Sequence, residues 1–225
     1  MLLGGLAPAP LPVAAQPILP SRTAGGAQRG PASEAWAAVT PATSAVPTIT
    51  ATGHGTTPQA PTSLKLRSGL HSPMPGGQMA GYHGDTGLDI SGRFRPVYAL
   101  AAGTLDYAER GHTVWRGPRD TDYCVRIELD TPLVYRGQRV THLYYAHLSA
   151  VEAVQPENAP VRRHVAAGER LGVSGIANGV FHLHLGLVLE GRVDQEYYSD
   201  VLREWQVREV LGNYKQNERL PGGAP

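Results

Sequence analysis

The pattern of residues changes abruptly near residue 64, and this change limits what the chain can fold into. Residues 1–64 hold ten of the nineteen prolines but only three charged side chains and one aromatic residue, Trp36. A segment with so few large apolar residues cannot bury enough surface to offset the entropy lost on ordering it. We therefore predict a disordered Pro/Ala/Thr-rich linker over 21–65 and a folded domain after it.

The first 20 residues are apolar and include the small residues Ala14 and Ala15, as found before a signal-peptidase site. They lack a basic start, and Pro8, Pro10 and Pro12 interrupt the stretch that should be a continuous apolar run. Residues 1–20 therefore read as a degenerate signal peptide or as an apolar tail. We favour export and expect the protein outside the cytoplasm.

The charges after residue 64 exclude two classes of partner. Removing Arg22, Arg29 and Glu34 from the totals of 20 basic and 19 acidic residues leaves 18 of each. A balanced chain offers no basic field to follow a phosphate backbone, so we expect no nucleic-acid partner. No run approaches the 18 or so apolar residues of a membrane helix, so we predict no transmembrane segment.

From residue 66 onward, apolar and polar residues alternate between punctuating Gly, Pro and Asp residues. Alternation with a period of two is typical of short strands, so we predict an all-β, mostly antiparallel domain over 66–193. The predicted strands are 97–101, 104–108, 123–129, 141–148, 170–174 and 182–190. Apolar residues recur near the helical period over 199–214, which predicts one amphipathic helix in the C-terminal segment 194–225. Cys124 cannot form an internal disulfide, and we interpret it as a small strand residue.

The clearest candidate for chemistry is the run from Phe181 to Leu187, which contains His182 and His184. Successive side chains of a strand point to opposite faces, so both imidazoles should project from one face and the apolar residues from the other. Two imidazoles about 7 Å apart can serve one site, one as a metal ligand and one directed at the reacting group. Alone, such a pair is more often two polar strand residues than a functional site.

A second predicted strand ends in Tyr145, Ala146, His147 and Leu148. Alternation places Tyr145 and His147 on one face, and we predict that both look into the same cleft as His182 and His184. His142 falls on the opposite face, so we interpret it as an ordinary surface histidine.

The third candidate run is Asp85-Thr86-Gly87-Leu88-Asp89. In a straight strand Asp85 and Asp89 would lie roughly 13 Å apart, too far to share a metal ion bound at about 2 Å. The chain must therefore turn back between them, and Gly87 permits such a turn. The alternative interpretation is an Asp/Gly-rich surface turn.

Together these three runs resemble the lysostaphin/LytM-type zinc endopeptidases, whose pattern is His-x-Gly-x-Asp, then Tyr-x-His-Leu, then His-Leu-His. The corresponding runs here are 85–89, 145–148 and 182–184, in the family order, and the resemblance covers roughly residues 80–190. It implies the duplicated hybrid motif fold, a mostly antiparallel sheet with a groove. It also implies a secreted or cell-envelope metalloendopeptidase, expected as a monomer, that hydrolyses peptide cross-links of bacterial cell-wall peptidoglycan.

The resemblance implies a role for each site residue. Asp85, Asp89 and His184 fall on the three ligand positions of one zinc ion, and His147 and His182 on the two catalytic histidine positions. The chain departs from the family at Asp85, where the family has His. Two carboxylates would offset the charge of the metal and weaken its pull on water, so zinc is expected to bind weakly or not at all.

Three alternatives stay open from the sequence. His83, two residues before Asp85, could replace it as the first ligand. The domain could instead be a catalytically degenerate LytM-like module that binds peptidoglycan or regulates another cell-wall hydrolase. A metal-free sugar- or protein-binding module would make the histidine pattern coincidental.

Overall fold

The computed structural model describes residues 64–81, 83–114, 117–192 and 200–222. The segment predicted over 1–20 and nearly all of the linker predicted over 21–65 lie outside these residues. Within the described residues, no helix is long and apolar enough to cross a membrane.

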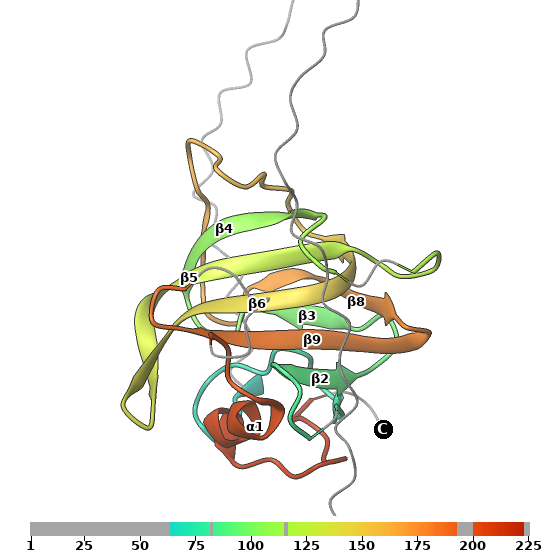
Figure 1. The fold of residues 1–225 in the computed structure, drawn as a ribbon, viewed down its shortest axis with the longest axis vertical. Helices are drawn as coiled ribbons and strands as arrows, with labels where there is room; N and C mark the ends of the chain where they lie inside the picture. The colour runs from blue at the N-terminus through green and yellow to red at the C-terminus, as the bar shows by residue number, and fades with distance from the viewer. Residues whose placement is uncertain (1–63, 82, 115–116, 193–199, 223–225) are drawn as a thin grey trace, which may run out of the picture. The chain divides into compact units, whose positions relative to one another are not determined.

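An antiparallel β-sheet forms the body of the domain (Figure 1), which confirms the predicted fold class. Its strands are β1 (Gln78–Met79), β2 (Leu88–Ser91), β3 (Pro96–Tyr98), β4 (Gly103–Arg110), β5 (Tyr123–Tyr135), β6 (Gln138–Val151), β7 (His164–Val165), β8 (Arg170–Ala177) and β9 (Val180–Leu189). The order across the sheet is β1-β2-β9-β8-β6-β5-β4-β7, with β3 paired to β8 and β9 paired also to β6. β9, which carries both candidate histidines, therefore pairs with β2, β6 and β8.

The single helix of the described residues, α1 (Glu204–Gly212), is shorter than the predicted 199–214. It begins where the backbone N–H of Arg203 donates to Oε1 of Gln206 at 2.7 Å, which satisfies a donor at the helix start. It ends at Gly212, followed by Asn213 in the left-handed conformation. The buried side chains of Val207 and Leu211 attach the helix to the core. The helix lies beside β2 (Figure 1).

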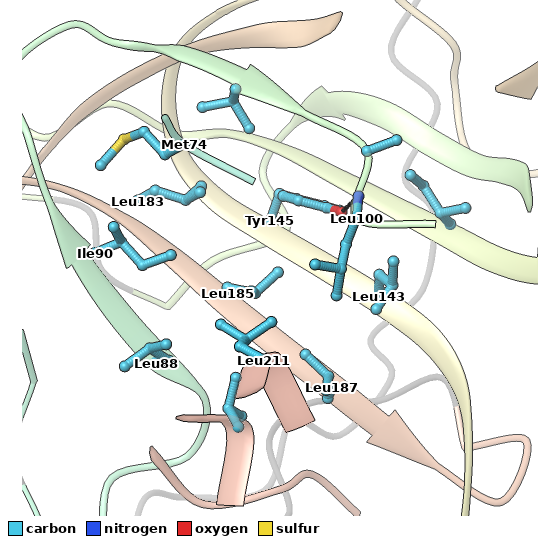
Figure 2. Close-up of a cluster of buried hydrophobic side chains, with 14 of the residues drawn as sticks. Met74, Leu88, Ile90, Leu100, Leu143, Tyr145, Leu183, Leu185, Leu187 and Leu211 are labelled. Carbon is cyan, nitrogen blue, oxygen red and sulfur yellow. Dashed lines mark hydrogen bonds between the residues drawn. The ribbon is translucent and has the colours of Figure 1, made fainter. Parts of the chain in front are cut away.

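The alternation predicted for β9 is present. Leu183, Leu185 and Leu187 are fully buried, and Figure 2 shows them in the cluster that also contains Leu143 and Tyr145 of β6. Burying a leucine or isoleucine side chain contributes about 1.5–3 kcal/mol, so this face fixes the register of β9. The opposite face of β9 is thereby left for His182 and His184.

Tyr145 belongs to this core, so the prediction that it looks into the cleft is wrong. Its side chain is fully buried, and its hydroxyl accepts a hydrogen bond from the backbone N–H of Leu100 at 2.9 Å (Figure 2). A buried phenol needs such a partner for its polar atom. The pairing of Tyr145 with Leu185 places the two side chains on the same, apolar face.

A smaller apolar cluster covers the other face of the sheet next to the candidate site. Its buried members are Tyr107, Cys124, Tyr144, Ala146, Val188 and Val201. Burial raises the pKa of the Cys124 thiol to about 11, so this cysteine stays protonated at neutral pH. Its contact with the Tyr144 hydroxyl fits the interpretation of Cys124 as a packing residue.

Candidate functional site

Asp89 and His184 face each other across the pairing of β2 with β9. Leu88 and Ile90, on either side of Asp89, are fully buried in the core, so the carboxylate projects from the opposite face. Asp89 Oδ1 lies 2.8 Å from His184 Nδ1. Two ligand atoms about 2 Å from one tetrahedral zinc ion are themselves about 3.3 Å apart. The separation of Asp89 Oδ1 and His184 Nδ1 is therefore close to that of two atoms that bind the same zinc ion.

His182 lies on the same face, opposite Ser91 of β2. Its Nδ1 is 3.0 Å from the carbonyl oxygen of Val180, and its Nε2 is 3.7 Å from Asp89 Oδ1. A carbonyl oxygen only accepts hydrogen bonds, so Nδ1 is the donor. In the neutral ring the lone pair is then on Nε2, the atom that faces Asp89.

His147 joins this group from β6. Its ring centroid is 5.0 Å from that of His182 and 6.0 Å from that of His184. The structure therefore brings together four of the predicted site residues: Asp89, His147, His182 and His184.

Strand alternation, however, is not what places His147 there. Ala146 pairs with His184 and shares its face, so simple alternation would turn His147 toward the core. Instead, His147 has a left-handed backbone with φ of 62°, and the pairing of β5 with β6 shifts register between Tyr145 and Leu148. This β-bulge reverses the direction of the His147 side chain. A left-handed backbone costs a residue other than glycine about 1–2 kcal/mol.

Two residues that the sequence analysis missed support the bulge. Thr121 Oγ1 donates to the carbonyl of His147 and accepts from the backbone N–H of Ile176, both at 2.9 Å. A Cβ at Gly175 would lie 2.0 Å from Thr121 Oγ1 and 2.6 Å from the His147 carbonyl oxygen. A glycine inside a strand signals such a close approach and could have been noticed, whereas nothing in the sequence marks Thr121.

The environment of His147 keeps its ring neutral. Burial, followed by the nearby His184 and His182, lowers the pKa of His147 to about 3. Its Nδ1 is buried and has no hydrogen-bond partner among the described residues. Burial opposes ionisation of Asp89, but the hydrogen bond from His184 and the neighbouring rings outweigh it and hold the Asp89 pKa below its ordinary value. At neutral pH the Asp89 carboxylate is therefore ionised and lies near the neutral imidazole of His147.

The carboxylate of Asp85 contacts the backbone of its own loop. Its Oδ1 accepts a hydrogen bond from the Thr86 backbone N–H at 2.8 Å. No three of Asp85, Asp89, His147, His182 and His184 have ligand atoms that all lie within 4.8 Å of one another, a criterion that one other set of described residues meets. His83, the alternative first ligand, is exposed.

The loop that carries Asp85 is attached to the segment just before α1. The N–H of Gly87 donates to the Leu202 carbonyl at 2.8 Å, and the N–H of Glu204 donates to the Asp85 carbonyl at 3.0 Å. Arg203 Nη1 donates to the carbonyl of Gly84 at 2.7 Å. Residues 202–204 were predicted to belong to a separate C-terminal segment, and nothing in the local sequence marks their contact with the site loop.

Gly87 itself approaches His184 closely. It has φ of 78°, and a Cβ there would lie 2.8 Å from His184 Nε2 and 2.8 Å from the Leu185 carbonyl oxygen. The turn between Asp85 and Asp89 was predicted to need this glycine for its backbone freedom. The structure adds a second reason, because the His184 ring occupies the space that a side chain at Gly87 would need.

The one set of three that meets the distance criterion is Asp106, Glu128 and His142, elsewhere on the sheet. Two guanidinium groups already hold its carboxylates: Arg162 donates to Asp106 and to Glu128 at 2.7 Å, and Arg126 Nε donates to Asp106 at 2.8 Å. A divalent ion would have to displace both arginines, so this set is better explained as an ion-pair network.

His142 is part of that network and is only 6% exposed, so the interpretation of it as a surface histidine is wrong. Its Nε2 is 3.6 Å from Asp106 Oδ2. Its predicted face is wrong as well. His142 does point to the face opposite that of Tyr145, but Tyr145 faces the core. His142, paired with Val188, therefore shares the sheet face of Ala146 and His184. Side chains from β4 and β5 cover that face at His142.

Comparison with known proteins finds solved structures that are similar to part of this chain. No protein-family model and no curated protein matches the chain. Among solved structures it is similar to the catalytic domain of the antimicrobial peptidase lysostaphin from Staphylococcus simulans, with 18% identity, 53% of this chain and 74% of that chain covered, and a TM-score of 0.34. It is also similar to a candidate glycyl-glycine endopeptidase LytM from Ruminococcus gnavus, with 21% identity, coverages of 58% and 48%, and a TM-score of 0.36.

These two are lysostaphin/LytM-type structures, the type that the three sequence runs resemble. A zinc-containing peptidase from Vibrio cholerae is similar at 16% identity, with 54% of this chain and 29% of that chain covered and a TM-score of 0.32. The chain thus spans less than two thirds of the second and third structures. At such TM-scores the likeness carries no functional argument, so the proposal below rests on the residues of this chain.

Proposed function

We propose that this protein is a metal-dependent endopeptidase that hydrolyses peptide cross-links of bacterial cell-wall peptidoglycan. The observation that carries the proposal is the convergence of Asp89, His147, His182 and His184 on one sheet face. His147 reaches that face only through a bulge with a left-handed backbone. Strain of this kind at a buried polar residue is characteristic of functional sites.

The donor atoms fit a zinc ion. A carboxylate oxygen and an imidazole nitrogen, both common zinc ligands, are already adjacent at Asp89 and His184. Asp85 is the proposed third ligand: its Oδ1 accepts the N–H of Thr86, and its Oδ2 would serve as the metal-binding oxygen. When bound, zinc supplies a Lewis acid and lowers the pKa of a bound water.

The two remaining histidines supply the proton chemistry in this proposal. His182 presents the lone pair of Nε2 toward Asp89 and serves as the general base that accepts a proton from water. His147, neutral and buried beside it, donates a hydrogen bond to the oxyanion that develops on the substrate carbonyl. Peptidoglycan peptides as substrate come from the sequence resemblance.

The second candidate function is a catalytically degenerate LytM-like domain that binds peptidoglycan or regulates another wall hydrolase. The metal position favours it, because Asp85 replaces the histidine of the family pattern and Asp85, Asp89 and His184 are not preassembled within metal-binding distance of one another. Retention of both candidate catalytic histidines favours the enzyme.

Asp85→His separates the two functions. We expect wild type to bind zinc weakly, and Asp85→His to raise zinc affinity about tenfold or more, the scale by which ligand environment changes metal affinity. Hydrolysis should rise with it, measured as new amino termini released from purified cell walls. His83→Ala is the matched control and should leave zinc affinity unchanged, since the His83 side chain is exposed.

Two results would change this account. If wild type binds no metal and Asp85→His cleaves nothing, the degenerate wall-binding function replaces the enzyme. If wild type hydrolyses wall peptides faster than Asp85→His does, then Asp85 is an adapted ligand and the inference of weakened binding is wrong.

A further inference from the structure

Residues 200–204 run beside the end of β9, the strand that carries two histidines of the candidate site. Val201 pairs antiparallel with Val188 of β9. The N–H of Leu202 donates to the Leu187 carbonyl at 2.9 Å, and both leucines are buried in the main core cluster. The 200–204 segment is therefore held against a rigid part of the sheet.

The same segment also pairs with the loop that carries Asp85. The carbonyl of Leu202 accepts the N–H of Gly87 at 2.8 Å. The N–H of Glu204 donates to the Asp85 carbonyl at 3.0 Å. Leu202 thus bonds to β9 through its N–H and to the Asp85 loop through its carbonyl, so one short segment fixes the distance between the two.

The Arg203 side chain adds a further bond to this loop. Its Nη1 donates to the carbonyl of Gly84 at 2.7 Å, and its backbone pairs antiparallel with Thr86. The Gly84 carbonyl belongs to the peptide group before the Asp85 Cα, and the Asp85 carbonyl belongs to the one after it. Peptide groups are planar, so holding one with Arg203 and the other with Glu204 fixes the direction of the Asp85 Cα–Cβ bond.

The composition of the loop makes such contacts necessary. Gly84 and Gly87, on either side of Asp85, have φ of 93° and 78°, in the left-handed region. Glycine gives a free loop many accessible conformations, so holding the loop in one of them costs entropy that contacts from elsewhere must offset. Residues 202–204 supply these contacts beside His184, whose ring lies close to Gly87.

We propose that Arg203 is a positioning residue of the metal site, and that its hydrogen bond to Gly84 sets where the Asp85 carboxylate lies. Arg203 acts through the backbone of the loop and is not itself a ligand. This role rests on the proposed function, because Asp85 is a ligand only if the site binds a metal ion. Residues that support a ligand in this way typically change metal affinity by about 10- to 100-fold.

Arg203→Gln is expected to weaken zinc binding by about tenfold. Glutamine is shorter than arginine, so the donor no longer reaches Gly84. Arg203→Lys keeps a long side chain with an N–H donor and should recover most of the affinity. The zinc affinity of the full chain is measured by competition with a chromophoric chelator.

Arg219→Gln is the matched control. Arg219 Nη1 donates to the carbonyl of Gly76 at 3.2 Å, the same kind of bond to a glycine outside the Asp85 loop. This variant should keep wild-type zinc affinity. In an Asp85→Ala background, Arg203→Gln should no longer change zinc affinity, whereas a general loss of stability would lower it in both backgrounds.

A second measurement needs no zinc. In the metal-free protein, amide hydrogen exchange at Thr86 reports on the Asp85 carboxylate, because the Thr86 N–H donates to Asp85 Oδ1. Arg203→Gln should speed this exchange by about tenfold, the value of one hydrogen bond. The buried amide of Leu105 should exchange as in wild type, and Arg219→Gln should change neither amide.

Arg203 does not position Asp85 if Arg203→Gln leaves zinc affinity and Thr86 exchange unchanged, or if Arg219→Gln changes them equally. An effect on zinc affinity of the same size in the Asp85→Ala background would also overturn the proposal. If wild type binds no zinc but Arg203→Gln speeds Thr86 exchange, Arg203 holds the Asp85 loop and the metal-dependent enzyme is contradicted. If wild type binds zinc and hydrolyses wall peptides while Arg203→Gln behaves as wild type, the enzyme stands and the role of Arg203 does not.

Discussion

Replacing His184 by alanine is expected to abolish zinc binding and wall-peptide hydrolysis together. The substitution removes the imidazole whose Nδ1 lies 2.8 Å from Asp89 Oδ1, and the remaining carboxylates cannot complete a zinc site alone. We expect zinc affinity to fall by about 100-fold or more. Changing a residue that merely supports a ligand can already cost about 100-fold, and loss of the ligand itself should cost at least as much. Competition with a chromophoric chelator measures it.

His164→Ala is the control for the loss of a histidine. His164 lies on β7, where its Nε2 contacts Asp130 at an exposed position. This variant should bind zinc and cleave walls as wild type does. If His184→Ala also retains wild-type zinc affinity, the proposed ligand set is wrong, whatever the wild-type activity.

The second large effect is expected at His147. Asn accepts the left-handed backbone, but its side chain is shorter than that of His and its amide stops short of the position from which His147 would donate to the oxyanion, so His147→Asn should keep the bulge and lose that hydrogen bond. We expect hydrolysis to fall by about 100- to 1,000-fold, the usual contribution of one oxyanion donor. Zinc stoichiometry should be unchanged, and the free energy of unfolding should change by less than about 2 kcal/mol.

Tyr145→Phe, a change on the same strand, should lower the stability of the fold and leave hydrolysis unchanged. It removes the hydroxyl that accepts the N–H of Leu100 and leaves that donor buried without its partner. Such a loss costs about 1–3 kcal/mol of folding free energy. Hydrolysis should be unaffected because Tyr145 lies in the core. Equal loss of activity in Tyr145→Phe and His147→Asn would contradict the placement of these two side chains.

Much of the site could be predicted from local pattern. Period-two alternation places Leu183 and Leu185 in the core, which leaves His182 and His184 together on the other face. Asp89, between Leu88 and Ile90, follows from the same rule. These predictions hold because a strand buried on one face has only one register that keeps its apolar residues in the core.

Alternation could not predict the direction of His147. Convergence with His184 was predicted for the wrong reason, because the bulge depends on Thr121 and on the space at Gly175, which reach His147 from other parts of the chain. Such contacts leave no periodic signal in the local sequence. Tyr145 was misplaced by the same reasoning, since it was grouped with His147 rather than with the core.

Other features depend on residues far apart in the sequence. His142 is buried because Asp106 of β4 and Arg126 of β5 cover it. The loop of Asp85 is attached to Glu204, more than a hundred residues further along the chain. Only the folded sheet brings these groups together, so a reading of single segments could not find them.

The central claim is that Asp89, His147, His182 and His184 form one metal-dependent hydrolytic site. Its most direct test is the release of new amino termini from purified cell walls by the full chain, first stripped of metal and then supplied with one equivalent of zinc. We expect the metal-free protein to release no new amino termini. Adding zinc should restore the release in wild type but not in His184→Ala. Equal release with and without zinc, or no release by folded wild type at any zinc concentration, would contradict it.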